Sequence, residues 1–209
     1  SLSSNTFEKE PTFAQHIEHS EELIENLRHL YTSGAMSDLE IRTDDGTLHA
    51  HKSILGARSP VLKKMIENNC VESSSNTITI TDCSAPAFEK FLLYLYTGKL
   101  EDRTLNAVML FYLLSVKYDV PVLREFCSNI LQDKFASKPV EEVSDIACDV
   151  LKLSELIDSK LKNSVTSFIV NNFPTVSNKQ SWKELMKSNS ELVSEILALV
   201  VTTCQRIQT

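Results

Sequence analysis

The sequence has few glycines, and those it has are scattered. Its four glycines stand at positions 34, 46, 56 and 98, so any two of them are at least 10 residues apart. A loop that cradles phosphate needs several glycines within one short turn, because the backbone must come close to the anion. The chain therefore contains neither a P-loop nor a GxGxxG dinucleotide-binding motif, and we expect no nucleotide cofactor.

Long apolar runs, paired cysteines and an excess of basic residues are also missing. No run of 18 apolar residues occurs, so we expect no membrane-spanning helix, and the first residues show no signal-peptide pattern. Lysine and arginine number 21 against 28 acidic residues, and the net charge of −7 argues against nucleic acid as a partner. The five cysteines form no CxxC pair, which favours free thiols in a reducing compartment, the nucleus or the cytoplasm.

The residues of a catalytic or metal centre are not found together either. All five histidines precede residue 52, and no GxSxG motif is present. His49 and His51 have the spacing of two zinc ligands, but on a strand they would point to opposite faces, and no acidic or cysteine cluster completes the set. We interpret them as a structural pair. Cys70 as a reactive thiol is a weak hypothesis, because the carboxylates beside it disfavour a thiolate. We therefore expect neither an enzyme nor a metal protein.

What the sequence does contain is a dense pattern between Ser37 and Ile66. Leu39 and Ile41 alternate with polar neighbours, as a half-buried strand requires. Asp44-Asp45-Gly46 is typical of a hairpin turn in which the glycine takes a positive φ. Ser59-Pro60 then has the form of a helix start, with a capping residue before a proline in the first turn. The stretch predicts a hairpin followed by two short helices.

The same stretch holds an ordered set of residues: Asp38, His49, Ala50, His51, Lys52, Leu55, Ala57, Arg58, Ser59 and Pro60. A second set follows at 91–98, with the sequence FLLYLYTG. Together they resemble the signature of the BTB (POZ) domain family. The resemblance implies an α+β chain with the BTB/POZ fold, a small β-sheet flanked by helices, and a module for protein–protein interaction.

The chain divides into four predicted segments. Residues 1–12 are polar and form a linker or tail, and residues 13–136 form the BTB/POZ domain. Residues 137–203 show only helical patterns and resemble the all-helical BACK domain that follows many BTB domains, and residues 204–209 form a tail. The whole resembles the speckle-type POZ (MATH-BTB) adaptors, in which a MATH domain recognises the substrate. We expect such a recognition domain to lie outside this chain, and the sequence leaves its identity open.

Several local patterns predict the elements of the BTB domain. Residues 13–31 read as an amphipathic helix, 67–76 as a polar loop and 77–81 as a strand. Ser84 is expected to cap a helix that stops near Gly98, and 104–116 are apolar nearly all round, so this helix should be buried.

The later helices are predicted from their caps and apolar positions. Asp119 is expected to cap the next helix. Its inward-facing residues would be Val122, Phe126, Ile130 and Leu131. Capping boxes at 181–184 and 188–191 predict two further helix starts in the tail.

The helix at 13–31 also carries a predicted dimer surface. In BTB domains the leading helix packs across a two-fold axis onto its partner, so the resemblance implies a homodimer. The candidate surface residues are Ile17, Leu23, Ile24 and Leu27. The BACK-like segment is a candidate for a second self-association surface. The alternative is that the apolar face packs only on its own domain.

Asp38 and Lys52 are predicted to form a charge pair. In BTB domains the matching acidic and basic residues lie close together at the base of the domain, where some transcriptional repressors present a groove to corepressors. We favour a structural role, a partly buried pair that fixes the hairpin against the helix, because an isolated charge pair is weak evidence for a site.

Cys70, Val71 and Glu72 are the main candidate for a binding site. Cullin-binding BTB adaptors are similar here, with an apolar residue, any residue and then a glutamate before the third strand. The apolar residue would enter a cullin pocket while the carboxylate accepts hydrogen bonds beside it. Cys70 is smaller than the usual anchor, but a free cysteine behaves as a small hydrophobe. Lys117 and Tyr118 are expected to extend the contact.

The resemblance thus implies a dimeric adaptor that binds cullin-3 and presents substrates for ubiquitination. The alternative is a BTB scaffold, or a recruiter of transcriptional corepressors, that does not bind cullin. A hydrolase using Cys70 is a distant third hypothesis.

Overall fold

The computed structural model describes the backbone of residues 13–73 and 76–207 and the side chains of residues 19–68 and 76–206. The contacts divide the chain into two units, Ser1–Glu101 and Asp102–Thr209. Among the described residues, no helix is both long and apolar enough to cross a membrane.

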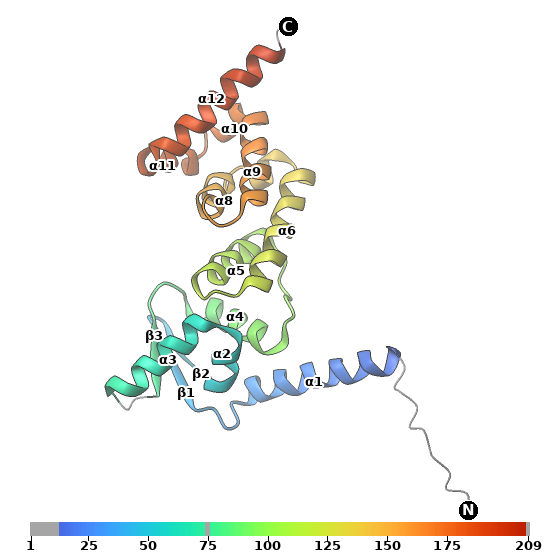
Figure 1. Ribbon diagram of the computed structural model, residues 1–209, viewed down its shortest axis with the longest axis vertical. Coiled ribbons are helices and arrows are strands. Elements are labelled where there is room, and N and C mark those ends of the chain that lie inside the picture. Colours follow the sequence, from blue (N-terminus) through green and yellow to red (C-terminus); the bar gives the residue numbers. More distant parts are fainter. Residues whose placement is uncertain (1–12, 74–75, 208–209) are drawn as a thin grey trace, which may run out of the picture. The chain divides into compact units, whose positions relative to one another are not determined.

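The first unit places a small sheet among four helices (Figure 1). Its strands are β1 (Leu39–Thr43), β2 (Gly46–Ala50) and β3 (Thr77–Ile80), in the order β2-β1-β3. Strand β1 pairs with β2 antiparallel and with β3 parallel. Ile41 is opposite Leu48 on one side and Ile78 on the other, and both isoleucines are fully buried. The apolar residues whose alternation predicted the hairpin thus form the buried face of the sheet.

The helices of this unit are α1 (Phe13–Ser33), α2 (Lys52–Arg58), α3 (Pro60–Ser73) and α4 (Ala85–Thr97). Helices α3 and α4 pack against the sheet, and α1 packs on α4. Helix α4 ends where the sequence predicts, because Gly98 takes a left-handed φ of 67° and its N–H closes the last turn on the Tyr94 carbonyl.

Two local predictions in this unit are wrong. Helix α3 continues through the polar segment that was expected to be a loop, because 67–73 contain no glycine or proline to stop it. Gly46 is not among the glycines with a positive φ. A Cβ added at Gly46 would lie 2.9 Å from the Cβ of Ala85, so glycine is needed there to let the hairpin approach α4.

The hairpin turn also caps α4. The Asp45 carboxylate accepts a hydrogen bond of 2.7 Å from the backbone N–H of Ala85, whereas the expected cap, Ser84, makes no side-chain capping bond. This hydrogen bond, with a second one of 2.9 Å from the Thr43 hydroxyl, lowers the pKa of Asp45 below its ordinary value of 3.8.

The described part of the second unit is all helical. Its helices are α5 (Leu105–Lys117), α6 (Pro121–Ser137), α7 (Val140–Val143), α8 (Ala147–Ser154), α9 (Ser159–Asn171), α10 (Phe173–Val176), α11 (Gln180–Ser188) and α12 (Ser190–Ile207). Helix α6 packs with both α5 and α9, so the last helix of the expected BTB domain packs against the helical tail. Tyr112 on α5 donates a hydrogen bond of 3.3 Å to Asp158, the residue that caps α9.

Several caps and faces in this unit differ from the predictions. Helix α6 begins after Val120, and Asp119 instead takes a left-handed φ of 51° in the turn before it. Ser181 lies inside α11, and Asn189 rather than Ser188 accepts the N–H of Leu192 at the start of α12. Val122 and Phe126 do not face inward: they are 72% and 37% exposed, because α6 turns its other face to its neighbours.

Candidate functional site

Three of the four predicted dimer residues line one groove in the first unit. Leu23, Ile24 and Leu27 of α1 face Ile54 and Ala57 of α2 and the end of α4 across a cavity of about 310 Å³. Leu23 is 59% exposed. Ile17 lies on the same helix, but its side chain is outside the described residues. The groove is an apolar surface open to a partner, lined by the residues that the sequence singled out.

The last turn of α1 is held firmly on this unit. The Tyr31 ring lies 4.9 Å from the Tyr96 ring of α4, both side chains being buried. The Arg28 guanidinium bridges Glu25 at 3.3 Å and Glu101 at 2.5 Å. Burial raises the pKa of Tyr31 above its ordinary value, which keeps the hydroxyl neutral. The predicted dimer helix is therefore anchored at its C-terminal end.

His51 is a structural residue in this anchor. Its backbone N–H donates to the Tyr96 hydroxyl at 2.8 Å, its Nδ1 lies 2.6 Å from the same oxygen, and its Nε2 lies 2.8 Å from the Ala35 carbonyl. The Ala35 carbonyl can only accept, so Nε2 carries a hydrogen and donates it to Ala35, and Nδ1 of the neutral ring accepts the Tyr96 hydroxyl proton. Burial raises the pKa of Tyr96 to about 12, so it remains a donor.

His49 lies exposed on β2, away from this network. Among the described residues, no group of three or more His, Cys, Asp or Glu side chains has the arrangement of a metal site. The predicted structural pair is therefore only half right, because His51 has a structural role and His49 takes no part in this network.

Asp38 and Lys52 contact one another at the start of α2. The Asp38 carboxylate accepts a hydrogen bond of 2.8 Å from the backbone N–H of Lys52, and the Lys52 ammonium donates to the Asn76 side chain at 2.5 Å. His51, the residue at the N-cap position of α2, makes no side-chain capping bond. Asp38, which lies just before β1, caps the helix in its place. Asp38 is exposed and Lys52 half-buried, which differs from the partly buried pair that was expected.

The predicted cullin-binding residues come from both units. Cys70, Val71 and Glu72 lie in the last turns of α3, just before β3, and their side chains are outside the described residues. Lys117 ends α5 and is exposed, with its ammonium 5.1 Å from the centre of the Tyr118 ring. The Tyr118 side chain is fully buried, so it contacts Lys117 from within the unit and is not accessible to a partner.

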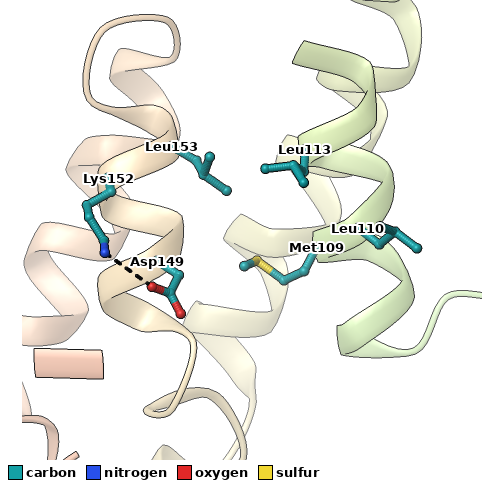
Figure 2. A pocket seen from close by; sticks show the side chains of 6 residues that line it. All are labelled: Met109, Leu110, Leu113, Asp149, Lys152 and Leu153. Carbon is teal, nitrogen blue, oxygen red and sulfur yellow. Dashed lines mark ion pairs between the residues drawn. The ribbon is translucent and has the colours of Figure 1, made fainter. Parts of the chain in front are cut away.

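An apolar groove between α5 and α8 was not anticipated from the sequence (Figure 2). Met109, Leu110 and Leu113 form one wall, and Leu153 with the Asp149–Lys152 ion pair forms the other, around a volume of about 470 Å³. Helix α5 was expected to be buried because it is apolar nearly all round. In the structure, one face of α5 packs in the core and another face lines this groove.

Two of the described cysteines lie in the core as thiols. Cys127 and Cys148 are both buried and free. Burial raises the pKa of Cys127 to about 12 and that of Cys148 to about 11, so both remain protonated thiols at neutral pH. These two cysteines are core residues.

Comparison with known proteins shows to which domain family the sheet and the helices around it belong. The family model described as the BTB/POZ domain matches residues 27–135, more than half of the chain. The chain belongs to the BTB/POZ domain family. This match begins within α1 and ends within α6, so the BTB region includes the α5–α6 pair of the second unit. BTB domains are protein-interaction modules, and the chain is accordingly a protein-interaction scaffold.

Individual relatives of this BTB chain agree with the family. TD and POZ domain-containing protein 3 of Mus musculus is 30% identical over 175 residues, 83% of this chain and 46% of that protein. A BTB/POZ domain-containing protein of Arabidopsis thaliana is 34% identical over 150 residues, 70% of this chain and 58% of that protein. BTB and MATH domain-containing protein 42 of Caenorhabditis elegans is 26% identical over 182 residues, 86% of this chain and 43% of that protein. The chain spans about half the length of the curated relatives it matches.

Proposed function

We propose that this BTB chain is a non-enzymatic, dimeric adaptor that binds cullin-3 and presents substrates for ubiquitination. Its homodimer would form through α1, with the helical tail as a second self-association surface. A recognition domain outside this chain would bind the substrate. The free thiols suit a reducing compartment, the nucleus or the cytoplasm.

The observation that carries the proposal is membership of the BTB/POZ family together with a relative that combines BTB and MATH domains. The motifs at 37–66 and 91–98 resemble those of adaptors that combine the same two domains. Relatives as far apart as a mouse TD and POZ protein and a nematode BTB and MATH protein match most of this chain, so the likeness extends into the helical tail.

The position of the candidate contact also supports the proposal. Cys70, Val71 and Glu72 lie in the last turns of α3, the helix that ends at Ser73 just before β3. An apolar residue and a carboxylate at a helix end are suited to an anchor and a hydrogen-bond acceptor in one partner.

The experiment is capture of purified cullin-3 by the 209-residue chain and its variants. Glu72→Ala should weaken capture by removing the acceptor, and Cys70→Glu should abolish it by placing a charge where an apolar group must enter a pocket. Glu67→Ala, an exposed glutamate earlier on the same helix, is the matched control and should bind like wild type.

The outcomes separate the adaptor from the alternative scaffold. If wild type captures cullin-3 and both site variants do so equally well, the site assignment is wrong while the adaptor function stands. If wild type captures none at micromolar concentration, the chain acts as a BTB scaffold or corepressor recruiter that does not bind cullin.

A further inference from the structure

The start of α6 presents an apolar surface that the proposed function does not use. Val122 is 72% exposed and Phe126, one turn later, is 37% exposed. The guanidinium carbon of Arg103 lies 5.3 Å from the centre of the Phe126 ring, within the range of a cation–π contact. We name these three residues, Val122, Phe126 and Arg103, the α6 patch.

The guanidinium of Arg103 has no acidic partner among the residues that the structure describes. The neighbouring Asp102 directs one carboxylate oxygen to Thr104 instead, accepting its backbone N–H at 3.0 Å and its hydroxyl at 2.7 Å at the start of α5. Arg103 is exposed, and the contact with Phe126 is the interaction that positions it. Its five N–H donors are therefore available to an external acceptor, in a chain whose net charge is −7.

The α6 patch is also well positioned before any partner arrives. Pro121 fixes the first turn of α6, and the N–H of Val120 donates to the Ser115 carbonyl at 2.8 Å across the turn from α5. A planar guanidinium held near an aromatic ring loses less freedom on binding than a lysine would. Arginine and aromatic residues are the types most often found at binding hot spots.

We infer that the α6 patch docks a helical segment of a partner protein that carries a carboxylate one turn from an aliphatic side chain. The carboxylate bonds the Arg103 fork, and the aliphatic group packs on Val122 and the edge of Phe126. The α6 patch contains none of the residues proposed for cullin-3, and the inference does not depend on that function.

The test uses the 209-residue chain and a fluorescein-labelled, alanine-based peptide of about 18 residues, a length that is helical in water. The peptide carries leucine and glutamate four residues apart on one face. The control peptide has glutamine in place of glutamate. Fluorescence anisotropy is expected to show saturable binding below about 1 mM and about fivefold weaker binding of the control peptide, the size of one exposed charge pair.

Variants of the α6 patch decide whether that binding uses the proposed residues. Arg103→Gln should remove the preference for glutamate over glutamine, and Arg103→Lys should retain only part of it because lysine lacks the fork. Val122→Asp should weaken both peptides. Glu125→Gln, on the same helix but outside the patch, is the control and should not weaken either peptide.

Three outcomes would overturn the inference. The first is no binding of the glutamate peptide at 1 mM or below, and the second is binding that Arg103→Gln and Val122→Asp leave unchanged. The third is a fall in the mass of the free protein on Val122→Asp, measured by sedimentation, because the α6 patch would then join two copies of this chain. A circular-dichroism melt of each variant excludes loss of folding as the cause.

Discussion

The Tyr96 hydroxyl lies 2.6 Å from Nδ1 of His51 and 2.8 Å from the backbone nitrogen of the same residue. One side chain of α4 thus satisfies two groups at the end of the hairpin, and the histidine passes the chain of hydrogen bonds on to Ala35 in the turn after α1. The sheet, α4 and the predicted dimer helix meet at this point. Its role is positional, because the side chains involved are buried.

Tyr96→Phe should lower the free energy of unfolding by about 1–3 kcal/mol, because two buried groups of His51 lose their partner. Urea denaturation measures this change. Tyr112→Phe is the control, since that hydroxyl makes a single longer bond of 3.3 Å and its loss should cost less. Equal stability of wild type and Tyr96→Phe would mean that the network contributes nothing.

Gly46→Ala should also destabilise the first unit. The added Cβ would lie 2.9 Å from the Ala85 side chain, too close for a normal contact, so the hairpin or α4 must shift. We expect a loss of about 1–3 kcal/mol in the same assay. Gly56→Ala is the control, because a Cβ there meets only the flexible Lys63 side chain at 3.6 Å. A variant at Gly46 as stable as wild type would contradict the close approach.

Asp45 gives a prediction for pH dependence. Its pKa is lowered on folding, chiefly by the hydrogen bond from Ala85, so it stabilises the protein above pH 3.8 and this contribution disappears as the pH falls through its folded pKa. Asp45→Ala should therefore be less stable than wild type at pH 6. The difference should shrink in acid below pH 3.8. Thermal melts at several pH values measure it, and a constant difference across this range would contradict the assignment.

The dimer prediction concerns the groove lined by α1. Wild type should sediment at about 47 kDa, twice the 23.5 kDa of one chain, at micromolar concentration. Leu27→Asp should shift it toward the monomer, because a charge would replace apolar burial in the groove. Met36→Asp, at a residue of the same unit that is 84% exposed and does not line the groove, should leave the mass unchanged. A wild-type monomer would contradict the dimer.

The parts of the fold that the sequence predicted well are those set by nearby residues. The hairpin follows from the alternation around Ile41, and the end of α4 follows from Gly98, since each depends on its own neighbours. Capping was predicted less well, because residues distant in sequence perform it. Asp45 caps α4 from 40 residues away, and Asp38 caps α2 from 14 away.

Exposure was the least predictable property. Val122 and Phe126 have helical spacing for a core face, and only the packing of α6 on its neighbours leaves them in water. Lys117 and Tyr118 were both expected on the surface, yet the Tyr118 ring is fully buried. Periodicity identifies an apolar face, but tertiary packing decides which faces are covered.

Titration of the 209-residue chain with purified cullin-3 in a calorimeter tests the adaptor function most directly. We expect saturable binding at micromolar concentrations, with one cullin for each chain and hence two for each dimer. No binding under these conditions, in protein that melts cooperatively and sediments as a dimer, would contradict the adaptor function and leave the BTB chain as a scaffold for other partners.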